Sequence, residues 1–120
     1  MNKIAKDDLS RDAYHEHLKV FGDAWMLIIV SELLDAPCRF NELQRRACGI
    51  SPVTLTVKLK KLEQLGIVVR EAKTKDQLSV SYHLTDKGRA LEPALRAIQH
   101  FGVQHFDVPE CEQECKKCTD

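Results

Sequence analysis

Three cysteines near the end of the chain have a spacing that could bind a metal. Cys111, Cys115 and Cys118 follow the pattern C-x3-C-x2-C, and such short intervals let one turn of backbone present several thiolates to one zinc ion or iron–sulfur cluster. A fourth ligand is needed, which His100, His105, a residue of a partner chain or a small molecule could supply. Two alternatives stay open: redox-active thiols, or a tail whose cysteines have no role.

Clustered positive charge is the second feature that could do chemistry. The chain carries 18 basic and 18 acidic residues, so its formal net charge is zero. Between residues 39 and 75, however, there are nine basic residues and only three acidic ones. A merely soluble surface mixes the two signs more evenly. The cluster therefore indicates a polyanionic partner, and double-stranded DNA is the one we expect.

Two short helices and a turn position most of this charge. Residues 40–47 have the spacing of a short amphipathic helix, and Gly49 supplies a left-handed conformation for a sharp turn. A second helix is expected over residues 52–65, with Ser51 as its N-cap and Pro52 in its first turn. Its buried stripe is Leu55, Leu59 and Leu62, and Gly66 ends it.

The other face of this second helix carries Thr54, Val57, Lys58 and Lys61. We expect these side chains to point outward together, because residues three and four apart on a helix are neighbours. Such a face fits the major groove of DNA. The plain alternative is a solvated surface helix whose lysines serve solubility.

A β-hairpin is expected to follow. Residues 67–71 are rich in β-branched side chains, and residues 78–84 alternate apolar and polar side chains. Residues 73–77 between them carry Lys73 and Lys75, and with the adjoining strand ends they form a wing, residues 72–79, that fits an approach to the phosphate backbone or the minor groove. Thr85 is expected to cap a further helix.

The first and last helices have apolar stripes that look longer than a monomer's core requires. Tyr14, Leu18 and Phe21 form one stripe. A homodimer built from these helices would place two reading helices, the helix expected over residues 52–65 in each chain, about 34 Å apart on one side of the DNA. Packing within one chain is the alternative for these stripes. The second stripe comprises Leu91, Leu95, Ile98 and Phe106, with Ala94 and Gly102.

Several motifs occur together in a recognisable order. They are Gly22-Asp23-Ala24-Trp25, Arg39-Phe40-Asn41-Glu42-Leu43, Gly49-Ile50-Ser51-Pro52, Leu59-Lys60-Lys61-Leu62-Glu63 and Tyr82-His83-Leu84-Thr85-Asp86-Lys87-Gly88. With this set, the chain resembles the HxlR-type transcriptional regulators over roughly residues 14–106. The resemblance implies a dimeric bacterial or archaeal DNA-binding regulator related to MarR-like proteins. Its fold would be mainly α with a small β-hairpin wing, a winged helix-turn-helix that dimerises through its terminal helices.

The resemblance also implies roles for single residues. Ser51, Thr54, Lys58 and Lys61 fall where the family's recognition helix meets DNA. We predict two groups of DNA-binding residues, since basic side chains beside a reading helix usually meet phosphates while its outer face meets bases. Arg39, Arg45, Arg46, Lys73 and Lys75 form the phosphate group, and Ser51, Thr54, Val57, Lys58 and Lys61 form the group on the reading helix.

The chain departs from the family in its cysteines. Many relatives have a cysteine followed by a proline ahead of the first helix, where it can sense thiol chemistry, but residues 1–14 contain no cysteine. That switch cannot be transferred to this position, although Cys38 and Cys48 remain available. The effector, a small molecule or a redox signal, is not specified by the sequence.

The remaining expectations concern organisation and class. Residues 1–106 should form one winged helix-turn-helix domain, and residues 107–120 an acidic cysteine-containing tail. No run reaches the roughly 20 apolar residues that a membrane span needs, and the charged first ten residues do not resemble an export signal, so a cytoplasmic location is expected. The five histidines form no acid–base constellation, so we expect no enzyme. The rival function is a winged-helix module that binds an acidic protein instead of DNA.

Overall fold

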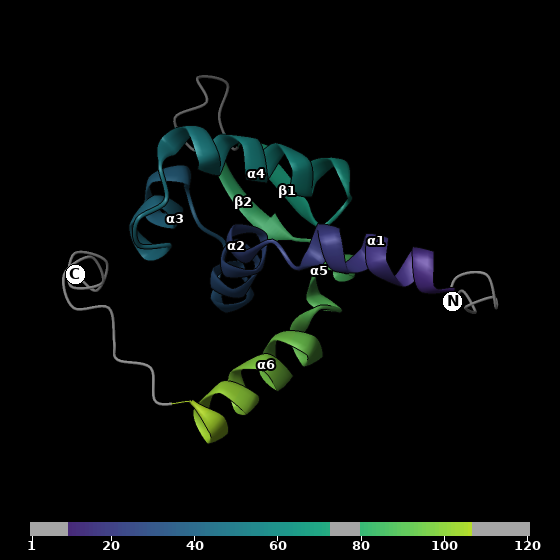
Figure 1. Ribbon diagram of the computed structural model, residues 1–120. Coiled ribbons are helices and arrows are strands. Elements are labelled where there is room, and N and C mark those ends of the chain that lie inside the picture. Colours follow the sequence, from purple (N-terminus) through teal and green to yellow (C-terminus); the bar gives the residue numbers. More distant parts are fainter. Residues whose placement is uncertain (1–9, 73–79, 107–120) are drawn as a thin grey trace.

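Helices dominate the fold, and a single hairpin accompanies them (Figure 1). The computed structural model describes residues 10–72 and 80–106. In chain order the elements are α1 (Arg11–Phe21), α2 (Ala24–Asp35), α3 (Phe40–Arg46), α4 (Pro52–Gln64), β1 (Val68–Ala72), β2 (Val80–Leu84), α5 (Asp86–Arg89) and α6 (Glu92–His105). This confirms a mainly α fold with a two-stranded antiparallel wing.

Four helices begin with a side chain that caps their backbone amides. Ser10, Asp23, Ser51 and Thr85 each accept a hydrogen bond from the backbone N–H three residues further on, at 3.1–3.2 Å. Such a bond satisfies an amide that has no partner inside the helix. The predicted caps at Ser51 and Thr85 are confirmed.

Two glycines allow the chain to reverse on either side of α4. Gly49, with φ 95°, follows α3 and opens the turn into α4. Gly66, with φ 77°, follows α4, where the Gly66 N–H donates to the Glu63 carbonyl and the Ile67 N–H to the Leu62 carbonyl. This pair of bonds is the Schellman motif, which favours glycine because a side chain is strained at positive φ. The predicted turn and stop are confirmed.

The core lies between α2, α4 and the hairpin. Helix α2 sits at the centre in Figure 1 and buries Met26, Ile29, Val30 and Leu33. The predicted stripe of α4 is fully buried against it, since Leu55, Leu59 and Leu62 are 0–2% exposed. Burying such a side chain stabilises the fold by about 1.5–3 kcal/mol, so α4 is held firmly along one face only.

The hairpin pairs Val68 with Leu84 and Ala72 with Val80, so its strands lie within two residues of the predicted ones. An additional bridge, which the sequence analysis missed, joins Cys38 to Tyr82. The Cys38 N–H donates to the Tyr82 carbonyl at 3.0 Å, and the Tyr82 N–H to the Cys38 carbonyl at 2.7 Å. The α2–α3 connection is thereby fixed to the free edge of β2.

The chain after the hairpin forms one helical turn and then a new helix. Helix α5 ends at Arg89, and α6 carries Pro93 in its first turn. A proline has no N–H to continue a preceding helix. Only the beginning of α6 packs on the core, through Leu91 and Leu95.

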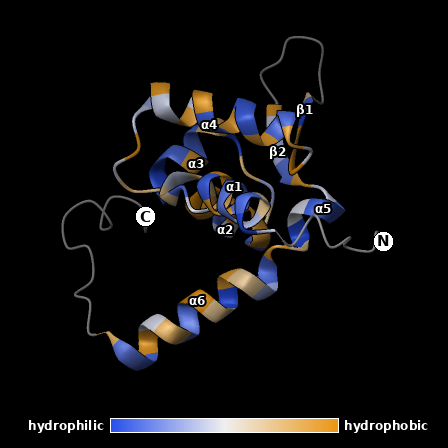
Figure 2. Cartoon of the chain, turned by 45° about the vertical axis from the view of Figure 1, so that its right-hand side comes forward, coloured by the Kyte–Doolittle hydropathy of each residue, from blue (hydrophilic) through white to orange (hydrophobic). Residues whose placement is uncertain are grey.

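No residue of α1 or α6 is fully buried, although Val20 and Phe21 of α1 and Leu95 of α6 pack partly buried against the core. In Figures 1 and 2, α6 stands apart below the rest of the molecule, and in Figure 1 α1 extends to the right. Five large hydrophobic side chains on these two helices, and a sixth directly after α6, are more than half exposed: Tyr14, Leu18, Ile98, Phe101, Val103 and Phe106. Within the described ranges, no helix is long and apolar enough to cross a membrane.

Candidate nucleic-acid interface

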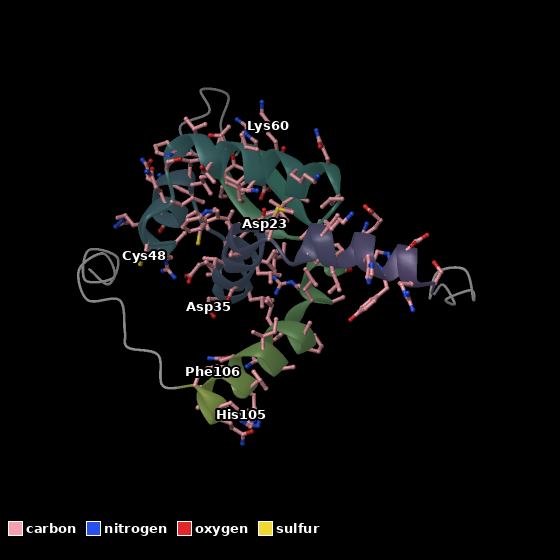
Figure 3. All side chains as sticks on the ribbon, in the orientation of Figure 1. Asp23, Asp35, Cys48, Lys60, His105 and Phe106 are labelled. Carbon is pink, nitrogen blue, oxygen red and sulfur yellow. The ribbon has the colours of Figure 1, made fainter. Side chains whose placement is uncertain are left out.

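The outer face of α4 is the surface that the fold leaves open for a partner. Opposite its leucine stripe, Val53 is 73% and Val57 56% exposed, and Lys60, Lys61 and Gln64 are exposed beside them. In Figure 3, Lys60 lies on the side of α4 that faces away from the rest of the molecule. An α-helix with one free polar and basic face has the size and charge to enter a major groove.

The structure divides the predicted reading group. Val57 and Lys61 are exposed as expected. Thr54 is half-buried on the flank of α4, where its hydroxyl accepts a hydrogen bond of 2.9 Å from Ser51 Oγ. Ser51 itself is exposed at the start of the helix.

Lys58 does not point outward with the others, and that part of the prediction is wrong. Its Nζ lies 2.6 Å from Asp23 Oδ2, and its side chain is 26% exposed. The physical reason is helix geometry: Lys58 follows Leu55 by three residues and therefore lies beside the buried stripe rather than opposite it. The sequence analysis also missed Val53 and Lys60, which the position opposite the leucines could have revealed.

The predicted phosphate-binding arginines differ in their surroundings. Arg39 and Arg45 are exposed, and the Arg39 backbone N–H donates to Glu42 Oε1 at 2.8 Å. Arg46 instead approaches Glu32 of α2, with Arg46 Nη1 3.7 Å from Glu32 Oε1. Its charge is therefore partly balanced within the chain, although its side chain is 45% exposed, and its contact with phosphate stays a prediction. Burial raises the pKa of Glu32, and the nearby Arg46 opposes that increase.

An additional basic residue joins the open face of α4 to the hairpin. Arg70 of β1 and Lys60 line the same small hollow of about 100 Å³, together with Phe40 and Tyr82. Positive charge therefore continues from α4 onto the base of the wing. The predicted wing lysines, Lys73 and Lys75, lie outside the described residues.

The cysteines in the described part of the chain are not equivalent. Cys38 is 3% exposed, and its Sγ lies 3.4 Å from the Ala36 carbonyl to which it donates. Burial raises the pKa of the Cys38 thiol, which disfavours the reactive thiolate. Cys48 is half-buried in the α3–α4 turn at φ 28°. In residues 10–72 and 80–106 no cluster of ligands fits a metal ion, and Cys111, Cys115 and Cys118 lie outside these ranges.

A cleft of about 570 Å³ separates α2 from α6. Its apolar wall includes Leu27, Ile28 and Ile98. Polar side chains border it as well, among them Glu32, Asp35, Glu92, Arg96 and Gln99. The cleft continues the exposed apolar surface of α6.

Comparison with known proteins gives the same fold and the same class. The model of the HxlR-like helix-turn-helix family matches residues 20–110. The HTH-type transcriptional regulator YybR of Bacillus subtilis is 38% identical over 93 residues, which are 78% of this chain and 74% of YybR.

Two solved structures have the same architecture. The reduced form of the transcriptional regulator YodB from B. subtilis has a TM-score of 0.69 at 30% identity, covering 84% of this chain and 98% of YodB. The redox regulator HypR in its oxidized form has a TM-score of 0.72 at 36% identity, covering 79% of this chain and 98% of HypR. YybR and YodB are named as transcriptional regulators, a class that does not include enzymes. This chain belongs to the HxlR-like helix-turn-helix family of transcriptional regulators.

Proposed function

We propose that this protein regulates transcription in the cytoplasm by binding a specific double-stranded DNA site as a homodimer, with α4 in the major groove. The single observation that carries the proposal is the outer face of α4. It is open along its length and carries two kinds of side chain that can recognise DNA, exposed lysines and exposed valines. Lysines can bind phosphates or guanines, and apolar side chains can contact thymine methyl groups.

The basic residues around α4 form the proposed phosphate-binding set. Arg39, Arg45 and Arg70 are exposed near the ends of α3 and on β1. Lys73 and Lys75 would extend the set onto the wing. Such contacts fix the register of a protein on DNA, while base contacts select the sequence.

Pairing of two chains is proposed to use α1 and α6. The six exposed hydrophobic side chains on and directly after these helices offer apolar surface that one chain does not bury, and so does the cleft between α2 and α6. A two-fold axis through them would present two α4 helices to successive half-sites. Dimerisation is typical of this family.

A redox input is the second part of the proposal. Structures of YodB and HypR are described as reduced and oxidized forms. In this chain the burial of Cys38 directs the proposal to Cys48 and to the tail cysteines Cys111, Cys115 and Cys118, which could alternatively bind zinc or an iron–sulfur cluster.

Fluorescence anisotropy with a labelled random duplex at low salt tests the DNA-binding part. The test variant carries Lys60→Glu and Lys61→Glu; the matched control carries Lys19→Glu and Arg89→Glu, which change the net charge equally on other elements. We expect the wild type and the control to bind in a salt-sensitive way and the test variant to lose binding. If the wild type binds no duplex but binds an acidic protein tightly, the protein-association module is the correct function.

A further inference from the structure

The contact between Asp23 and Lys58 is the one feature of the reading helix that groove binding does not explain. Lys58 Nζ and Asp23 Oδ2 are 2.6 Å apart, and about a quarter of each side chain is exposed. A lysine that binds DNA is expected to extend from the helix into solvent. This one is directed toward the body of the molecule, where Asp23 lies between α4 and α2 in Figure 3.

Asp23 is itself held in place by the backbone. Its Oδ1 accepts a hydrogen bond of 3.1 Å from the Met26 N–H, which caps α2. The preceding residue, Gly22, turns the chain so tightly that a Cβ there would lie 2.5 Å from the Leu18 carbonyl oxygen. The Asp23 carboxylate therefore connects the start of α2 with the middle of α4, two residues after the end of α1.

No other ion pair in residues 10–72 and 80–106 joins α4 to another element. The body of α4 is otherwise attached by apolar contacts, through Leu55, Leu59 and Leu62, and at its C-terminal end Lys87 Nζ donates to the Leu65 carbonyl at 2.8 Å. Hydrophobic contact is non-directional, so it resists separation of α4 from α2 better than rotation or sliding. The directional contact between Lys58 and Asp23, beside the leucine stripe, restricts the rotation and sliding of α4 that the leucines permit.

The stability that this contact provides is expected to be small, because partly exposed ion pairs usually contribute little. Its geometric effect is larger, since base recognition depends on placing the reading helix correctly. The pKa of Asp23 is lowered, chiefly by the hydrogen bond from Lys58, so the carboxylate is ionised at neutral pH.

We propose that Asp23 is a positioning residue for DNA reading: through Lys58 it holds α4 at a fixed orientation relative to the α1–α2 junction. Lys58 then belongs to this link and makes no contact with DNA. The proposal rests on the proposed function. The link would also transmit movements of α1 to the reading helix. Helix α1 is one of the helices proposed to pair two chains.

The test compares the full-length wild type with Asp23→Ser, Lys58→Met and the double variant. Serine keeps the cap, as Ser10 and Ser51 do at other helices of this chain, but loses the contact with Lys58. Lys58→Arg is the conservative variant that retains it. Glu16→Gln is the matched control, because it also removes one negative charge and one ion pair, the exposed Glu16–Lys19 pair on α1.

Binding is measured to a duplex selected by the wild type from a random library and to a random duplex. We expect Asp23→Ser and Lys58→Met each to reduce the preference for the selected duplex by roughly 3- to 30-fold, with the double variant no worse. Lys58→Arg and Glu16→Gln should keep the preference. The salt dependence of binding to the random duplex should not change in Lys58→Met.

Several results would overturn the proposal. A salt slope that falls by about 0.9 in Lys58→Met would make Lys58 a direct phosphate ligand. Unchanged preference in Asp23→Ser would remove Asp23 from reading. Hydrogen exchange of the free protein decides the matter without DNA: exchange in α4 should rise in Asp23→Ser and Lys58→Met, and equal exchange refutes the link. Absence of wild-type DNA binding would refute the proposed function separately.

Discussion

Replacing Gly88 by alanine is expected to destabilise the protein strongly, although alanine is the better helix former. Gly88 is buried in α5, and a Cβ there would lie 2.5 Å from the Ile67 carbonyl oxygen and 3.0 Å from Leu84 Cδ2. The Ile67 oxygen cannot move freely, because it accepts hydrogen bonds from the Thr85 N–H at 3.0 Å and from Thr85 Oγ1 at 3.2 Å.

The magnitude follows from these contacts. Weakening two hydrogen bonds costs about 1 kcal/mol each, and forcing a methyl group into a packed site costs about 1–3 kcal/mol more. The intrinsic preference of a helix for alanine returns about 1 kcal/mol. We therefore expect Gly88→Ala to lower the free energy of unfolding by about 2–4 kcal/mol.

Urea unfolding followed by circular dichroism, at one fixed protein concentration, measures this change. Gly102→Ala is the control, since nothing lies within 4 Å of a Cβ at that position of the described chain. It should be neutral or stabilising by up to about 1 kcal/mol. A Gly88→Ala protein within 0.5 kcal/mol of the wild type, on the order of ordinary surface substitutions, would refute the packing described for α5.

Three further predictions concern pH, pairing and the tail. The folded state lowers the pKa of Asp23 from its ordinary value of 3.8, so the contribution of this carboxylate to stability is present above that pH and is lost as the pH falls through the lower folded value. Urea unfolding between pH 6 and 3 should therefore show a smaller decrease in the free energy of unfolding for Asp23→Ser than for the wild type. Equal decreases would contradict this prediction. The double variant Ile98→Asp and Phe101→Asp should shift sedimentation from dimer toward monomer while circular dichroism stays the same, and an unchanged dimer would place pairing elsewhere. Protein purified without oxygen should contain zinc or iron, or should lose DNA affinity on oxidation. The substitutions Cys111→Ser, Cys115→Ser and Cys118→Ser should abolish the metal content or the sensitivity to oxidation. If the wild type contains no metal and keeps its affinity on oxidation, the tail has no sensing role.

Local features of this fold were predictable from the sequence because their causes are local. The Ser51 and Thr85 caps and the turns at Gly49 and Gly66 depend on a few neighbouring residues. The leucine stripe of α4 also follows from spacing alone. These features determine where the reading helix begins, where it ends and which side it buries.

Contacts between distant segments were not predictable in this way. Lys58 and Asp23 are 35 residues apart, and Arg46 meets Glu32 only because α3 packs beside α2. A helical pattern gives the direction of a side chain but not the partner it finds there. The bridge between Cys38 and Tyr82 also joins distant segments of the chain. The residues around Cys38 do not distinguish this segment from an ordinary loop between two helices.

The expected direction of Lys58 was wrong for a second reason. The spacing that groups Lys58 with Thr54 and Lys61 identifies neighbours on a helix, but it does not identify the angle opposite Leu55, Leu59 and Leu62. That angle selects Val53, Val57 and Lys60. The buried stripe therefore locates the free face of a helix better than the spacing of the polar residues does.

Photo-crosslinking tests the central claim most directly. A benzophenone amino acid is placed at Val57 on α4 or at Phe101 on α6, two positions that are 56% and 55% exposed, and each protein is irradiated with a labelled duplex at low salt. The account predicts that the Val57 probe links to DNA, whereas the Phe101 probe links one protein chain to another. DNA crosslinks from Phe101 and none from Val57 would contradict the assignment of α4 as the reading helix.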